Sequence, residues 1–179
     1  MHMDLNDFRH LVILVDKAKN IALFPVSKTK EPIPNDPDGL QCYGYFPAYV
    51  PTELGYPYSR AELAHKLENV MGQWCLYPCF CEEENEAGMT FEEKYYGASS
   101  FRSAMQGKKM LDIGWDDVQG KYVTLSLPCK SGYAYLGIIT ETLSHDAGWD
   151  DFADAVIELI GKDLSELKSF KTFKGKLNL

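Results

Sequence analysis

Apolar side chains recur with helical spacing in two stretches of the chain, and each stretch predicts a long helix. The first helix runs from Ser59 to roughly Trp74 and begins with an S-x-x-E capping box, in which Ser59 and Glu62 each accept a backbone N–H. Its core-facing stripe is Leu63, Leu67, Val70, Met71 and Trp74. The second helix runs from Trp149 to about Ile160 and is ended by Gly161. Its buried face is predicted to be Phe152, Val156, Leu159 and Ile160.

Shorter helices are predicted between and after these two. Thr90 and Glu93 repeat the capping-box spacing ahead of a short helix. A helix of one or two turns from Ser100 to Gln106 is stopped by Gly107. Asp163 is suited to cap a further short helix that extends through Leu167.

Alternating apolar and polar residues predict sheet between positions 108 and 143. The strands are Met110 to Trp115, Tyr122 to Leu127 and Tyr133 to Thr142, with turns at Gly120 and at residues 130–132. Short turns between consecutive strands are typical of an antiparallel meander.

The first 58 residues are harder to assign. Leu11 to Val15 and Ile21 to Val26 read as a hairpin that turns at residues 16–20, although Leu5, Phe8, Val12 and Val15 also fit a helical stripe. We favour strands, because three of the five residues from Leu11 to Val15 are β-branched. Residues 31–58 hold six of the nine prolines, so an extended, turn-rich segment with one short strand at Cys42 to Phe46 is expected.

These elements predict a single α/β domain of the α+β type, with a central, mostly antiparallel sheet and flanking helices. The 179 residues suit one domain that spans residues 1–179 and buries a substantial core. The ends, residues 1–8 and 171–179, are expected to be frayed.

Net charge, the lengths of apolar runs and cysteine content narrow the range of functions to be considered. The net charge of −8 argues against direct binding of nucleic acid, which usually requires a basic surface. The longest apolar run is far shorter than a membrane-spanning helix, and the N-terminus has no signal-peptide pattern, so no membrane contact is expected. Five cysteines, an odd number, are most simply reduced thiols of a cytoplasmic protein.

The negative charge is concentrated in two stretches that lack Lys and Arg, residues 82–93 and 131–161. Such stretches usually only aid solubility, but they also suit a surface that steers a basic protein into contact. The residues predicted to bind a partner are Glu82, Glu83, Glu84, Glu86, Asp116, Asp117, Asp146 and Asp150.

Catalytic or metal sites are the alternative. Cys75, Cys79 and Cys81 are close enough in sequence to bind zinc with a fourth ligand from Cys42, Cys129, His65 or His145, but a pair of C-x-x-C units, the usual signal, is absent from the sequence. A thiol nucleophile with His65 or His145 as base is also conceivable. The neighbouring carboxylates Asp116–Asp117 and Asp150–Asp151 point in different directions on a strand or a helix, so neither pair converges on a metal. The sequence has no glycine-rich phosphate loop and no G-x-S-x-G motif. We therefore expect neither enzymatic activity nor a cofactor.

The order of features from residue 45 to 161 resembles a known family. The stretch YYGASSFRSAMQGKKMLDIGWDDVQGKYVTLSLPCKSGYAYLGIITETL passes from a glycine and serines through a short helix and a lysine-rich turn into successive strands, and WDDFADAVIELI closes it with a helix. The earlier YPYSRAELAHKLENV matches the family's P…S-x-x-E-L helix. This pattern is similar to immunity proteins of bacterial contact-dependent growth inhibition systems. The chain departs from the family at residues 151–155, which lack the usual glycine of the closing helix.

The resemblance implies a small cytosolic protein that binds and blocks the C-terminal toxin domain of a large surface-delivered effector. Toxins of these systems are often nucleases, which carry basic clefts, so an acidic inhibitor fits. A sheet edge that accepts a toxin strand is a second way of binding. Because partners in the family are polymorphic, the resemblance transfers no binding residue.

Overall fold

The computed structural model describes residues 9–32, 41–45, 51–73, 91–116, 120–128 and 135–162. The described elements are β1 (Arg9–Val15), β2 (Ile21–Pro32), β3 (Gln41–Tyr45), β4 (Thr52–Leu54), α1 (Arg60–Met71), α2 (Phe91–Tyr96), α3 (Phe101–Ala104), β5 (Lys109–Asp116), β6 (Gly120–Pro128), β7 (Tyr135–Leu143) and α4 (Trp149–Gly161). No helix in these ranges is both long and apolar enough to cross a bilayer. The expected helix from Asp163 to Leu167 lies outside the described residues.

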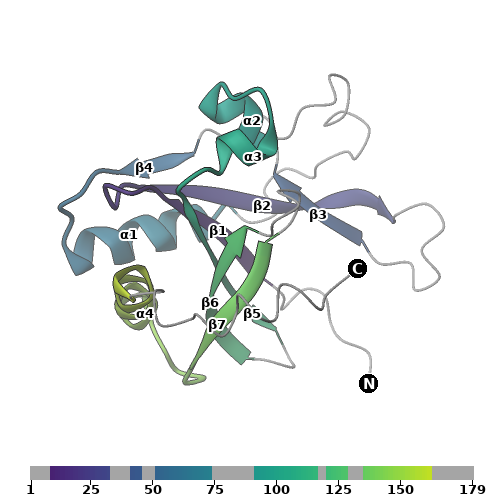
Figure 1. The fold of residues 1–179 in the computed structure, drawn as a ribbon. Helices are drawn as coiled ribbons and strands as arrows, with labels where there is room; N and C mark the ends of the chain where they lie inside the picture. Colours follow the sequence, from purple (N-terminus) through teal and green to yellow (C-terminus); the bar gives the residue numbers. More distant parts are fainter. Residues whose placement is uncertain are drawn as a thin grey trace.

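The described strands form one antiparallel sheet in the order β3-β2-β1-β5-β6-β7, and β4 pairs with β2 off this path (Figure 1). The α+β prediction is therefore confirmed. Strand β1 joins the two halves of the sheet, because it pairs with β2 on one side and with β5, almost a hundred residues later, on the other. The predicted meander is present as β5, β6 and β7.

The N-terminal segment is a hairpin, as favoured over the helix. The Asp16 amide donates to the Asn20 carbonyl at 3.0 Å, and the Asn20 amide donates to the Asp16 carboxylate at 2.9 Å. Lys19 adopts the left-handed conformation, with φ at 68°, that this turn requires. Because β1 lies between β2 and β5 and has helices above and below, Leu11 to Val15 are all buried, which explains their continuous apolar run.

Helices α1 and α4 lie side by side on one face of the sheet, here called the helical face (Figure 1). Alternate residues of the strands point toward them, among these Leu11, Ile13, Leu111, Ile113 and Val123. The predicted stripes fill the gap between helices and sheet, except that Trp74 lies outside the described residues. The buried helix residues are Leu63, Ala64, Leu67, Val70, Met71, Phe152, Ala153, Ala155, Val156, Leu159 and Ile160. This layer holds most of the described core.

Helices α2 and α3 lie on the other side of the sheet, here called the opposite face (Figure 1). They cover a smaller cluster built from Val12, Leu14, Ala22, Phe24 and, on α3 and the turn that follows it, Ala104 and Met105. The α3 helix begins as predicted, since Ser100 Oγ accepts the Ser103 amide at 3.2 Å, and Gly107 follows with a φ of +73°.

Several elements differ from the sequence expectation. Strand β2 continues to Pro32, past the expected end at Val26, and α3 ends at Ala104, before the expected Gln106. The predicted short strand near Cys42 is present as β3, but β4 was not predicted, because three residues between Pro51 and Gly55 carry almost no periodic signal. Gly161 is the last residue of α4 rather than a left-handed cap, and Lys162 closes the helix with φ at −60° and ψ at 129°.

Candidate functional site

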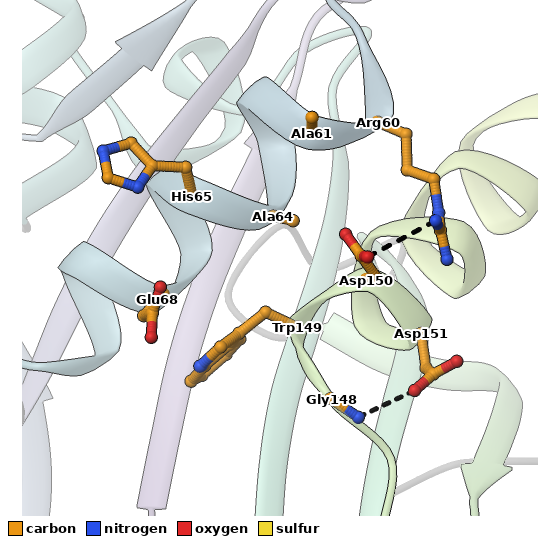
Figure 2. Close-up of a pocket in the computed structure, with 9 residues that line it drawn as sticks. All are labelled: Arg60, Ala61, Ala64, His65, Glu68, Gly148, Trp149, Asp150 and Asp151. Carbon is orange, nitrogen blue, oxygen red and sulfur yellow. Dashed lines mark hydrogen bonds and ion pairs between the residues drawn. The ribbon is translucent and has the colours of Figure 1, made fainter.

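A shallow groove lies between α1 and the first turn of α4, and it is the hollow drawn in Figure 2. We call it the α1–α4 groove, and its volume is about 610 Å³. One wall comes from α1 and the other from the start of α4. The lining residues are Arg60, Ala61, Ala64, His65, Glu68, Gly148, Trp149, Asp150 and Asp151.

The α1 wall is fixed by the predicted capping box. The Ser59 amide donates to Glu62 Oε2 at 2.8 Å, and the Glu62 amide donates to Ser59 Oγ at 3.2 Å. The Ser59 hydroxyl also donates to Glu62 Oε2, at 2.8 Å. The two bonds that the carboxylate accepts, from the Ser59 amide first and from the hydroxyl second, lower the pKa of Glu62. The first turn of α1, which carries Arg60 and Ala61, is therefore held in a defined position at the groove.

The α4 wall begins with half of such a box. The Gly148 amide donates to Asp151 Oδ2 at 2.7 Å, but glycine offers no side chain in return. Asp150 and Asp151 also lie in the first turn, where the positive end of the helix dipole favours carboxylates. Both observations explain the acidic start of α4 without a ligand.

Arg60 spans the groove and partly neutralises the acidic face of α4. Its Nε lies 2.7 Å from Asp154 Oδ1, and Nη1 lies 3.4 Å from Asp150 Oδ2 (Figure 2 draws the Asp150 pair). The hydrogen bond to Asp154 is the main reason that the pKa of Arg60 is raised. Residues 131–161 contain no Lys or Arg, but the fold places Arg60 of α1 against them. Lys162 also pairs with two of these acidic residues, since its Nζ lies 2.8 Å from Glu141 Oε1 and 3.4 Å from Glu158 Oε1.

A second hollow of about 400 Å³ adjoins the groove, and we call it the tryptophan hollow. Trp149 packs against Phe152 with ring centroids 5.4 Å apart and against Trp115 at 5.9 Å. The Arg9 guanidinium lies 5.8 Å from the Trp115 ring centroid. Glu68, Gly148 and Trp149 line both hollows, so the two hollows adjoin at these residues. Sequence reasoning placed neither tryptophan in a site, and Trp149 carried a signal only as the start of a helix.

The predicted partner-binding residues are only partly brought together. Asp150 lines the groove, and Asp146 lies exposed in the turn between β7 and α4. Ser144 Oγ donates to Asp146 at 2.7 Å, which is the main cause of a lowered Asp146 pKa. Asp116 is the last residue of β5. Glu82, Glu83, Glu84, Glu86 and Asp117 lie outside the described residues, so their role in binding stays a prediction.

The metal and thiol hypotheses also stay predictions. Cys75, Cys79, Cys81 and Cys129 lie outside the described residues, and Cys42 is placed only as part of β3. His65 is exposed on α1, and its Nε2 lies 3.1 Å from Asn69 Nδ2. Within the described ranges, no group of three His, Cys, Asp or Glu residues could hold a metal ion.

The opposite face carries polar contacts that the sequence did not single out. His10 Nε2 lies 2.9 Å from Asp112 Oδ1, and Ser126 Oγ, which is almost fully buried, donates to Asp112 Oδ2 at 3.5 Å. Asp112 lies between the other two, whereas a nucleophilic triad needs the histidine in the middle. These contacts therefore link β1, β5 and β6 and do not activate Ser126.

Two solved structures have a similar fold. A protein of unknown function from Neisseria meningitidis superposes with a TM-score of 0.55 and 12% identity, covering 89% of this chain and 96% of that chain. A chain of a CdiA-CT/CdiI toxin and immunity complex from Yersinia pseudotuberculosis superposes with a TM-score of 0.56 and 12% identity, covering 85% of this chain and 94% of that chain. No protein-family model matches the sequence. No curated protein matches it either. At this identity the likeness shows a shared fold.

Proposed function

We propose that this protein is an immunity protein that binds and neutralises the C-terminal toxin domain of a contact-dependent growth inhibition effector in the cytoplasm. The observation that carries the proposal is the fold likeness to a chain of the CdiA-CT/CdiI complex, which extends over 94% of that chain. The likeness is therefore to a whole component of a toxin and immunity complex. The sequence resemblance from residue 45 to 161 supports the immunity role independently.

The charge of the chain favours the inhibitor over the toxin. A toxin that cleaves nucleic acid needs cations at the phosphates, whereas this chain has a net charge of −8. An acidic inhibitor can occupy the basic cleft of such an enzyme and associate with it rapidly. We therefore propose a basic nuclease domain as the partner, and inhibition by stoichiometric binding without catalysis.

The test begins with the gene upstream of this one, where a very large secreted protein is expected. Its C-terminal domain is expressed from an inducible promoter, alone and together with this protein. The expected result is growth arrest by the domain alone, rescue on co-expression, and a stable complex of the two proteins in size-exclusion chromatography. A non-cognate toxin domain serves as control and should not be neutralised. Continued arrest on co-expression, or arrest caused by this chain itself, would overturn the proposal.

The predicted acidic residues are tested by association kinetics. Reversing Glu82, Glu83 and Glu84 together is expected to slow association with the toxin domain at low salt, with little change in dissociation. Reversing Asp146 and Asp150 tests the second acidic region in the same way. An unchanged association rate at low salt would remove the corresponding cluster from the interface.

A further inference from the structure

Two side chains from different helices lie at the junction of the α1–α4 groove and the tryptophan hollow. Glu68 projects from α1 and Trp149 from the first turn of α4, and both line both hollows. Figure 2 shows the Glu68 carboxylate and the Trp149 indole next to each other at the edge of the groove, whereas Asp150 points toward Arg60. The junction thus combines one carboxylate with one aromatic surface.

The aromatic side of the junction is firmly held. Trp149 is partly exposed, and its ring packs against Phe152, which is 2% exposed, at a centroid distance of 5.4 Å. Trp115 supports the same cluster from the end of β5, 6.1 Å from Phe152. A tryptophan ring fixed by its neighbours and open on one side is typical of the residues that dominate protein interfaces.

The cations around the junction are already engaged. Arg60 is paired with Asp154 and Asp150. The Lys121 ammonium donates to the Ala147 carbonyl at 2.5 Å, and Arg9 lies over Trp115. By contrast, among the described residues no ion pair or hydrogen bond engages the exposed Glu68 carboxylate. The positive end of the α4 dipole, which would repel a cation, is offset by Asp150 and Asp151 in its first turn.

We propose that this junction is the docking point for an arginine or lysine side chain of the partner protein, with the cation against Trp149 and its charge paired with Glu68. Tryptophan is the best aromatic ring for a cation–π contact, and a carboxylate beside it supplies the hydrogen-bond acceptors. The inference rests on the proposed function, because the partner is the toxin domain and its basic character supplies the side chain. Beyond the proposed function, the inference names the surface that binds the toxin domain.

The experiment measures the affinity of the purified toxin domain for Glu68→Lys and Trp149→Ala by biolayer interferometry. Each change is expected to weaken binding by about tenfold or more, the range of an interface hot spot. The loss caused by Glu68→Lys should shrink at high salt, because salt screens charge, while the loss caused by Trp149→Ala should persist. Thermal unfolding followed by circular dichroism shows whether each variant folds. Because Glu68 is exposed, Glu68→Lys keeps the test valid if Trp149→Ala unfolds.

Two matched variants separate docking from general effects. Glu158→Lys makes the same charge change at an exposed position of α4 beyond the groove, and Tyr56→Ala removes an aromatic ring that is 55% exposed near the start of α1. Both should bind within about threefold of the wild type. Equal weakening by Glu68→Lys and Glu158→Lys, or unchanged binding by Glu68→Lys and Trp149→Ala, would overturn the docking point while the complex still forms. The absence of a complex with the wild-type protein would instead overturn the proposed function itself.

Discussion

The two faces of the sheet are built differently, although the same strands supply both. On the helical face, α1 and α4 bury one contiguous cluster that reaches from β2 to β6. On the opposite face, the buried residues of the apolar cluster come from β1, β2 and the α2–α3 region, and β5 adds only the partly buried Met110. Beside it, β5, β6 and β7 carry polar side chains such as Asp112, Thr124 and Thr140, and the two threonine hydroxyls lie 2.9 Å apart. The helical face should therefore dominate the stability of the fold.

Substitution of one leucine on each face tests this difference most strongly. Leu67→Ala on α1 and Leu14→Ala on β1 remove the same atoms from sites that are 0% and 2% exposed. We expect Leu67→Ala to cost about 4 kcal/mol and Leu14→Ala about 2 kcal/mol, because the cost of a cavity depends on how far its surroundings collapse. The short α2–α3 layer can move more easily than the packed pair α1 and α4. Urea denaturation measures both values, and equal losses would contradict the comparison.

The next effect is at Gly114, where the opposite face is closely packed despite its polarity. A Cβ atom there would lie 2.6 Å from Tyr122 Oη and 2.8 Å from the Arg9 carbonyl oxygen. Gly114→Ala is therefore expected to destabilise the protein by about 1–3 kcal/mol, as in other overpacked sites. Adding Tyr122→Ser should restore only part of the loss, since the carbonyl contact remains. Full stability of the single variant would show that the ring and strand β1 shift without cost.

The sequence predicted the elements of the helical face well, because buried stripes and capping residues are local signals. The α1 capping box is formed by the predicted Ser59 and Glu62, and strands β5 and β6 begin and end within one or two residues of their expected positions. The alternation in β6 also predicted the polar side of that strand, which carries Tyr122, Thr124 and Ser126. It did not indicate that His10 of β1 reaches this polar face and contacts Asp112. The hydrophobic period of one segment predicts its local structure, but it does not predict which distant segment it contacts in the tertiary fold.

The same limit applies to the candidate site. Counting charges along the sequence made residues 131–161 appear uniformly acidic, whereas Arg60 pairs with two of their aspartates from across the groove. Trp115 and Trp149 were assigned to a strand and a helix start, and their packing on each other and on Phe152 makes them one surface. The sequence therefore predicted an acidic region but not the residues in it that are available to a partner.

The starts of α1 and α4 provide a smaller comparison on the helical face. Ser59→Ala removes the hydroxyl that accepts the Glu62 amide, and we expect a loss of about 1 kcal/mol, typical of an N-cap. Thermal unfolding in buffer at neutral pH measures it. Ser59→Thr serves as control and should retain most of the stability, because its hydroxyl can accept the same bond. A loss equal for both variants would contradict the capping role.

Acid should weaken the same cap. The pKa of Glu62 is lowered below its ordinary value of 4.5 by hydrogen bonds from Ser59, so the charged form is favoured in the folded state. Its contribution is therefore complete above the unfolded-state pKa and is lost as the pH falls through the folded-state pKa. The stability gap between the wild type and Glu62→Gln should narrow from pH 7 to pH 3. A constant gap across this range would show that the charge of Glu62 does not contribute.

The smallest expected effect is a gain at the incomplete cap of α4. Gly148 has φ at −97° and ψ at −176°, an extended conformation that serine adopts without strain, and a Cβ atom there would lie no closer than 3.9 Å to Asp151 Oδ2. Gly148→Ser would add a hydroxyl acceptor for the Asp151 amide, which already donates to the Gly148 carbonyl at 3.1 Å, so we expect a stabilisation of only a few tenths of a kcal/mol. Gly148→Ala is the control, because it also stiffens the unfolded chain but offers no acceptor. If both variants gain equally, the reduced freedom of the unfolded chain explains the effect. The added hydroxyl would then contribute nothing, because Asp150 and Asp151 already interact favourably with the helix dipole at this end of α4.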